Sequence, residues 1–210
     1  MNDFSNLMSG LIGAVVGVLL AVVLARFAFA LRLNGIRNFL RFYLSTIAQD
    51  KLQKYVTDVG NALKEIHGHE LHPDFMKQGY DMMPMLTSEV FKSITNEDMA
   101  RVMYNQKNLT DIIDFYYSVD FLKDHMPITY FREYVTKLEQ HYAEKNLKTN
   151  TERALHDLEC PFIKHEREYK SADLQLKEQT ANECITLCSN LVKNLKGRGL
   201  WWILKYTLKF

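Results

Sequence analysis

Apolar residues fill an unbroken stretch near the start of the chain, from Leu7 to Ala25 (LMSGLIGAVVGVLLAVVLA), with no charge and almost no polar group. Wound as an α-helix, these nineteen residues are about 28 Å long, close to the roughly 30 Å of a bilayer's hydrocarbon core. A buried helix of a soluble protein seldom runs so long without a polar face. The pattern therefore predicts a transmembrane helix, which together with a short tail occupies residues 1–33.

A cleaved signal peptide is the competing interpretation of this stretch. Ala28 and Ala30 form the A-x-A pattern that signal peptidase recognises. The preceding tail, however, contains Asp3 and no Lys or Arg, so the positive region of a signal peptide is missing. The apolar run is also longer than the usual stretch of about 7–15 residues. A retained anchor is the favoured interpretation.

Basic residues lie on only one side of the predicted span, and their position indicates its orientation. Lys and Arg remain on the cytoplasmic side of a membrane helix. We therefore expect a single-pass protein of the cell (inner) membrane, with its N-terminus outside and its C-terminal domain in the cytoplasm. The residues expected at the membrane interface on this side are Arg26, Arg32, Arg37 and Arg41.

Small residues recur at four-residue steps inside the span. They are Gly13, Gly17, Ala21 and Ala25, and on a helix they form one ridge. Such a ridge lets the backbones of two membrane helices approach closely. We therefore expect these four residues to pack one copy of the span against another, which makes a homo-oligomer the predicted state.

The pattern changes after residue 33 from uniformly apolar to periodic. Apolar residues then recur in steps of three and four, which is typical of a helix with one buried stripe or of a coiled-coil seam. The first clear run is Leu52, Tyr55, Val59, Ala62 and Ile66. The last is Leu174, Ala181, Cys184, Ile185, Cys188, Leu191, Val192 and Leu195.

Prolines and polar stretches divide the segment between these two runs. Residues 69–94 contain two prolines and a glycine, which predicts short helices with turns. Pro127 is suited to the first turn of a helix, and Pro161 is expected to kink or end the helix before it. The polar stretch 145–151 (KNLKTNT) is the best candidate for an internal linker.

Together these patterns predict an all-α protein. A single N-terminal transmembrane helix is followed by an α-helical, partly coiled-coil-like cytoplasmic domain over residues 34–196. The span runs into the first periodic helix with only Asn34-Gly35 as a possible joint, so we expect a continuous or lightly hinged stalk.

A basic and aromatic segment, residues 197–210, ends the chain. Its Trp201, Trp202, Lys205 and Lys209 are typical of a helix that lies in the membrane interface, where tryptophan favours the headgroup level and lysine pairs with anionic lipid. Two alternatives remain: the apolar side chains could cap the helical domain, or the alternation of large residues from Trp202 to Phe210 could form a strand.

The net charge of the whole chain is close to zero, but the net charges of its segments differ. The 210 residues carry 26 Lys and Arg against 25 Asp and Glu, a net charge of +1, so we expect no nucleic-acid partner. Residues 1–43 nevertheless carry +3 and residues 193–210 carry +5, whereas residues 44–192 carry −7. Both ends therefore suit a negative membrane surface, which makes the lipid bilayer the first predicted partner.

Histidines gather at one place, where His67, His69 and His72 lie within six residues. Imidazoles bind zinc, but a helical zinc motif places its histidines four apart, whereas His69 and His72 are three apart. These residues are therefore weak metal candidates, and no cofactor is expected. Cys184 and Cys188 lie on an apolar stripe and are expected to act as small buried hydrophobic residues.

The chain contains neither a glycine-rich phosphate loop nor a G-x-S-x-G nucleophile motif. Nothing in the sequence therefore argues for an enzyme. The favoured function is a membrane-anchored scaffold that self-associates and binds an unidentified protein partner. An oligomerising effector that permeabilises the bilayer is the first alternative, and a metal-dependent enzyme built on the histidine cluster is the second.

Overall fold

The computed structural model describes residues 2–67, 94, 96–103, 106–123, 127–195, 203–205 and 207. Throughout these residues the chain forms helices, turns and short connections, and no strand occurs among them. The all-helical class predicted from the sequence is confirmed for this part of the chain. The principal helices are α1 (Asn2–Phe42), η1 (Tyr43–Ala48), α2 (Gln49–His67), α5 (Asn96–Met103), α6 (Gln106–Lys123), α7 (Pro127–Glu144), α8 (Asn150–Glu159) and α9 (Pro161–Asn194).

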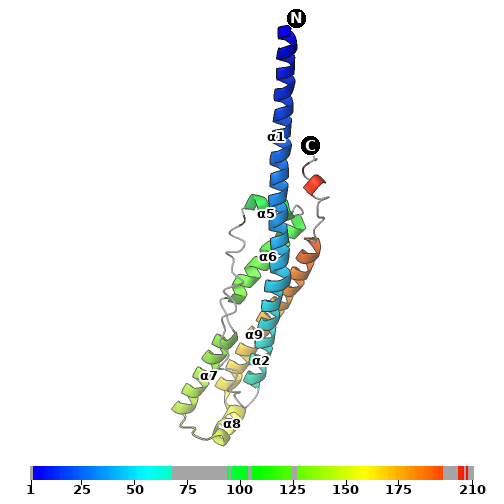
Figure 1. Ribbon diagram of the computed structural model, residues 1–210. Coiled ribbons are helices and arrows are strands. Elements are labelled where there is room, and N and C mark those ends of the chain that lie inside the picture. The colour runs from blue at the N-terminus through cyan, green and yellow to red at the C-terminus, as the bar shows by residue number, and fades with distance from the viewer. Residues whose placement is uncertain are drawn as a thin grey trace.

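The first three helices form one unbroken rod, whose N-terminal half projects beyond the rest of the molecule (Figure 1). The sequence placed a possible joint at Asn34-Gly35, but α1 passes through both residues. The departure from α-geometry comes later, in the π-helical η1. The expectation of a continuous stalk is therefore confirmed, and the expected position of its irregularity is wrong.

The burial pattern gives a physical reason for the π-helical stretch. Leu40, Leu44, Ala48 and Leu52 are all buried and recur every four residues. An α-helix has 3.6 residues per turn, so a strict four-residue repeat drifts around its surface. A π turn contains more residues, because its hydrogen bonds run from residue i to i+5. The wider turns of η1 keep this stripe facing the body.

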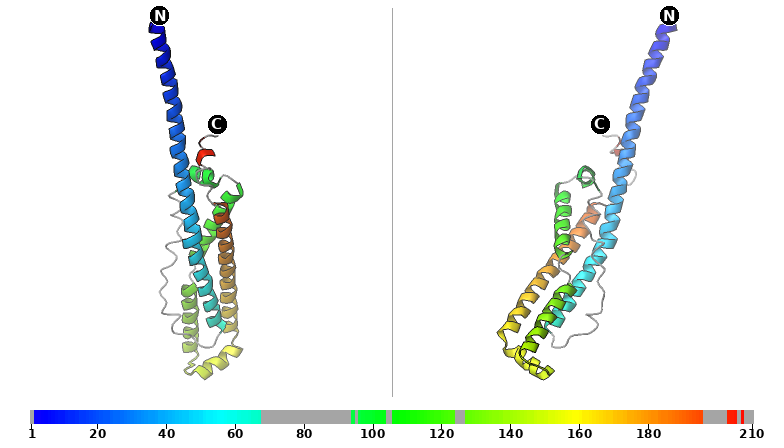
Figure 2. Two further views of the ribbon diagram at one scale, coloured as in Figure 1. Left: turned by 45° about the vertical axis from the view of Figure 1, so that its right-hand side comes forward. Right: turned by 90° about the vertical axis from the view of Figure 1, so that its left-hand side faces the viewer.

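The body is built around α9, the longest helix outside the membrane candidate. The last third of the rod, α2, packs along α9, and α6 and α7 contact other parts of the same helix (Figure 2). The short α5 lies against α1 at one end, and α8 lies at the opposite end, beside α9. The core therefore lies between α9 and the helices packed on it, with α7 in contact with both α2 and α9.

Both apolar runs predicted from the sequence meet in this core. The α2 residues Leu52, Tyr55, Val59, Ala62 and Ile66 are buried, as are Leu174, Ala181, Cys184, Cys188 and Leu191 of α9. Each buried aliphatic side chain of this kind contributes roughly 1.5–3 kcal/mol of transfer free energy relative to an exposed one. The stability of the body rests on this α2–α9 packing.

Local sequence signals fix the helix ends that the structure describes. Helix α7 begins at Pro127, as the proline predicts, and α2 extends to His67. Thr149 opens α8 with a capping box: its side chain accepts a hydrogen bond from the Glu152 N–H (3.2 Å), and the Glu152 carboxylate accepts one from the Thr149 N–H (2.9 Å). The polar stretch 145–151 thus holds a turn and the first residues of α8.

The break expected at Pro161 is confirmed, because Cys160 has extended backbone geometry between α8 and α9 and Pro161 opens α9. The short helices expected in residues 69–94 lie outside the described residues, except for Ile94, which is buried.

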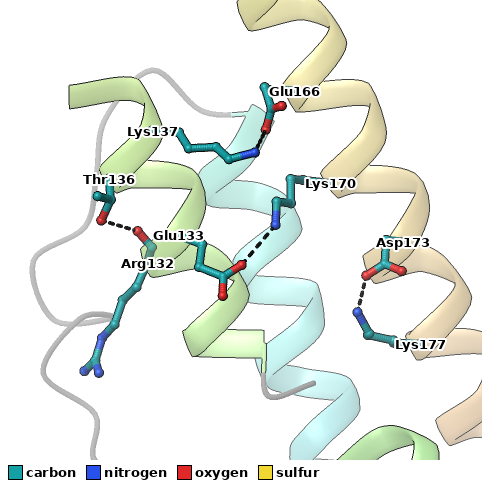
Figure 3. A network of polar contacts seen from close by, with 8 residues as sticks. All are labelled: Arg132, Glu133, Thr136, Lys137, Glu166, Lys170, Asp173 and Lys177. Carbon is teal, nitrogen blue, oxygen red and sulfur yellow. Dashed lines mark hydrogen bonds and ion pairs between the residues drawn. The ribbon is translucent and has the colours of Figure 1, made fainter. Parts of the chain in front are cut away.

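Ion pairs join α7 to α9 along the side of the body (Figure 3). Lys137 Nζ lies 3.0 Å from the Glu166 carboxylate, and Lys170 Nζ lies 3.3 Å from that of Glu133. Both pairs cross between the two helices. They orient α7, which also packs on α2, against α9.

The most buried charge in this network is on Lys177, whose side chain is only 1% exposed. Its ammonium pairs with Asp173 one turn earlier on α9 (Figure 3) and lies 3.7 Å from the centre of the Tyr130 ring of α7. The ammonium of Lys170 lies 3.6 Å from the centre of the same ring. Two cations therefore lie close to one aromatic ring, and each makes a cation–π contact with it inside the body.

Removing the charge of Asp173 should destabilise the body far more than removing that of Lys177. In the Asp173→Asn variant a buried ammonium loses its counter-ion, which typically costs about 3–5 kcal/mol. In Lys177→Met the charge disappears together with its desolvation penalty, and the Asp173 carboxylate that is left behind is 26% exposed to water, so we expect a smaller loss. The free energy of unfolding of the full chain in detergent, followed by helical circular dichroism, measures both. Equal losses in the two variants would contradict this assignment.

Candidate membrane anchor and its junction with the helical body

The projecting half of α1 exposes large apolar side chains on all sides. Between Leu11 and Leu24 every Leu, Ile and Val is 41–64% exposed. A surface helix of a soluble protein shows apolar residues on one stripe only. This helix is long and apolar enough to cross a membrane, which matches the span predicted from the sequence.

Contact with the body begins at the end of the predicted span. Ala30 and Leu33 are fully buried, and Phe29 packs against the core. The helix runs without a break through Ala28 and Ala30, the residues that suggested signal-peptide cleavage. Cleavage after Ala30 would sever α1 inside the part that packs on the body. The fold therefore favours a retained anchor.

The arginines that follow the span have different surroundings. Arg32 forms an ion pair with Asp98 of α5, with a distance of 2.5 Å between Nη2 and Oδ2. Arg37 is buried and donates from Nε to the carbonyl oxygen of Leu195 (3.0 Å) and from Nη2 to that of Asn194 (3.1 Å). Arg26 is half-buried and Arg41 is exposed. Two of the four predicted interface residues thus hold α1 to the body.

The contact of Arg37 has a clear electrostatic basis. The last carbonyl groups of a helix lack partners within it, and the C-terminal end carries a partial negative charge. Arg37 supplies two N–H donors and a positive charge to this end of α9. It therefore fixes the end of α9 beside α1, close to the base of the predicted membrane span.

Among the residues that the structure describes, none packs against the ridge of small residues. A side chain added at Gly13 or Gly17 would meet no atom within 4 Å. Ala21 and Ala25 are exposed. The face that the sequence predicts for helix packing is therefore open to another helix.

The C-terminal segment returns to this junction. Residues 203–205 are helical and lie beside α1, beyond the end of α9 (Figure 2). Ile203 and Thr207 are buried, whereas Lys205 is exposed. The described residues of this segment are helical rather than extended. The other three predicted interface residues of the segment, Trp201, Trp202 and Lys209, lie outside the described residues.

Only His67 of the histidine cluster lies within the described residues; His69 and His72 do not. His67 is exposed, and its Nε2 atom lies 3.2 Å from Ser171 Oγ of α9. The metal-dependent alternative built on this cluster therefore stays a prediction.

The two thiols on α9 match the structural role expected of them. Both are fully buried. Burial raises the pKa of Cys184 to about 11 and raises the pKa of Cys188 as well. Both thiols therefore remain protonated at neutral pH, and in this state they pack as small hydrophobic groups.

Sequence reasoning missed a different group of metal-binding side chains, formed by His141, His156 and Cys160. Their ligand atoms all lie within 4.8 Å of one another. His141 Nε2 is 2.9 Å from His156 Nε2 and 3.5 Å from Cys160 Sγ. The only sequence signal was the four-residue step from His156 to Cys160. His141 is brought to them by the turn at 145–149, which no spacing rule reveals.

A polar pair one residue farther along each helix supports this group. Tyr142, next to His141, donates its hydroxyl proton to Asp157, next to His156, with oxygen distances of 2.8 and 2.9 Å. Burial, together with this bond, raises the pKa of Tyr142 above its ordinary value. The pair stays hydrogen-bonded across the neutral range and holds α7 against α8.

Comparison with protein-family models, curated proteins and solved structures finds no match to this chain. Its function must therefore be inferred from its own residues.

Replacing Arg37 should loosen the junction between α1 and α9. The Arg37→Ala variant loses two charge-assisted hydrogen bonds to buried carbonyl groups, and we expect the unfolding free energy to fall by about 1.5–3 kcal/mol. Arg41→Ala removes the same charge from an exposed site four residues later and serves as the matched control. Thermal unfolding of the full chain in detergent measures both, and equal stability of the two variants would contradict the role of Arg37.

Proposed function

We propose that this protein is a membrane-anchored helical scaffold, with its N-terminus outside the cell membrane and its body in the cytoplasm. The observation that carries the proposal is the projecting half of α1, which exposes apolar side chains on all sides. Transfer of one large aliphatic side chain out of water is worth roughly 1.5–3 kcal/mol. For the whole projecting helix the sum is on the order of tens of kcal/mol, which exceeds the net stability of a typical domain, about 5–15 kcal/mol.

The junction supports both the depth and the orientation of the anchor. Arg26 and Arg32 follow the span, and the exposed Lys205 belongs to a segment that lies beside α1 at the same level (Figure 2). Basic residues on this side favour the cytoplasm. They also suit the negative surface of the cytoplasmic leaflet.

Self-association is the second part of the proposal. A helix with no polar face that sits alone in lipid gains little from hydrophobic contacts with another helix, so close packing of backbones decides association. The open ridge of Gly13, Gly17, Ala21 and Ala25 provides such a surface. Pairing through this ridge would place two bodies side by side on the cytoplasmic face.

The body is suited to binding rather than to chemistry. Its core is the seam between α2 and α9, and the three- and four-residue steps of that seam support a coiled-coil-like pairing within one chain. The partner that the scaffold binds is a protein that we do not identify.

Cysteine labelling tests the anchor and its orientation together. The native cysteines are buried, so a maleimide should react mainly with a cysteine introduced at an accessible position. The two single reporters are Ser5→Cys before the span and Leu176→Cys at an exposed position of α9. In spheroplasts of an expressing bacterial host, a membrane-impermeant maleimide should label the Ser5→Cys reporter. It should label the Leu176→Cys reporter only after lysis. Labelling of both reporters only after lysis would contradict the anchor, and the reverse pattern would contradict the orientation.

Bulky substitutions test the ridge. Gly17→Ile and Ala21→Ile should lower the dimerisation constant in lipid by roughly tenfold, which corresponds to about 1.4 kcal/mol. Val15→Ile and Leu19→Ile place the same side chain on the opposite face of the helix and should leave the dimer unchanged. Chemical crosslinking and native mass spectrometry of the membrane-extracted protein measure the dimer and also reveal the mass of any bound partner.

Unchanged crosslinking in the two ridge variants would contradict self-association through this face. Leakage of a dye from vesicles that contain the wild-type protein would favour the permeabilising effector over the scaffold, whereas retention of the dye is the expected result.

A further inference from the structure

We propose that His141, His156 and Cys160 form a binding site for Zn²⁺ at the tip of the body. The three side chains come from the end of α7, the end of α8 and the joint between α8 and α9. This tip lies at the opposite end of the molecule from the N-terminus of α1 (Figure 1). The site therefore stands apart from the candidate anchor, and its evidence is independent of the proposed scaffold function.

The distances fit a four-coordinate zinc ion. With Zn–N bonds of about 2.0–2.1 Å and a Zn–S bond of about 2.3 Å, tetrahedral geometry places two nitrogens about 3.3 Å apart and a nitrogen and a sulfur about 3.6 Å apart. The observed separations are 2.9 Å between the imidazole nitrogens and 3.5 Å between His141 Nε2 and Cys160 Sγ. Opening the histidine pair by about 0.4 Å would bring it to the tetrahedral value, and the ligand atoms of His156 and Cys160 lie within 4.8 Å of each other.

Hydrogen bonding alone joins only two of these three atoms at a time. His141 Nε2 faces both His156 Nε2 and Cys160 Sγ. A neutral imidazole nitrogen carries either one proton or one lone pair, so it cannot make a full hydrogen bond to both neighbours. A cation at the point where the atoms converge accepts a lone pair from each imidazole and from the thiolate.

The surrounding structure holds the ligands in place before any ion binds. The ring of Phe162 stacks on His141 with a centroid distance of 4.9 Å, and the two histidine rings stack at 5.2 Å. The Tyr142–Asp157 pair fixes α7 against α8 one residue beyond the two histidines. Cys160 is buried at a defined helix joint. Such supporting contacts orient metal ligands and raise affinity.

The donor set selects the class of ion. Two imidazoles and a thiolate suit zinc and related transition metals, whereas Mg²⁺ and Ca²⁺ prefer oxygen ligands. Among the residues that the structure describes, no fourth His, Cys or carboxylate ligand atom joins the group. Water would take the fourth position. The bound ion would link α7, α8 and the start of α9 and so stabilise the tip.

Metal titration of the purified full chain in detergent, after treatment with a chelator, tests the site. We expect one equivalent of Zn²⁺ to bind and to raise the unfolding temperature, because an ion that binds only the folded state stabilises it. Co²⁺ should give intense visible bands and a thiolate-to-cobalt charge-transfer band. Cys160→Ser should abolish the charge-transfer band and weaken Zn²⁺ binding by more than about 100-fold. His156→Ala should weaken binding to a similar degree.

His165→Ala is the matched control, since His165 is an exposed histidine on the first turns of α9 and lies outside the group. Its affinity for Zn²⁺ should equal that of the wild type. Circular dichroism verifies the helical fold of every variant. If His156→Ala fails to fold, Cys160→Ser still tests the site, because it replaces only one atom. Wild-type protein without the charge-transfer band, or Cys160→Ser with wild-type Zn²⁺ affinity, would overturn the proposal.

Discussion

The packing of α2 along α9 is the contact on which the rest of the body depends. It joins residues more than one hundred positions apart in the chain and buries the apolar stripe of both helices. Helix α6 then packs on α9, and α7 contacts both α2 and α9. Because α9 contacts nearly every other part of the body, a shift in its register would displace all of them.

A buried charge gives this packing a means of specifying register. The apolar residues Leu174, Ala181 and Cys188 recur every seven positions along α9, and Lys177 occupies the same seam between them. A single polar residue in such a seam favours the one alignment that satisfies it, at some cost in stability. Here Asp173 and the Tyr130 ring provide that environment. The network in Figure 3 therefore helps to set the register of α9 against its neighbours, in addition to its effect on the stability of the body.

The continuity of the rod gives the proposed anchor a mechanical consequence. The helix that would cross the membrane is the same helix that enters the core, with only the π-helical η1 between α1 and α2. Arg37 ties this rod to the end of α9 near the base of the span. In the proposed arrangement, a rotation or approach of paired spans would be transmitted directly to the body, since no flexible linker separates the two.

The sequence by itself determined the helical class, the exposed apolar span, the stripes of α2 and α9, and the helix boundaries at Pro127 and Pro161. These features follow from local periodicity, proline geometry and the length of an uncharged run, all of which act over a few turns of helix. Tertiary structure alone decided the surroundings of Arg37, the burial of Lys177 and the grouping of His141, His156 and Cys160. Each of these depends on which distant segments meet in space. No periodicity contains that information, because it follows from the packing of whole helices and from the turn that folds α8 back against α7.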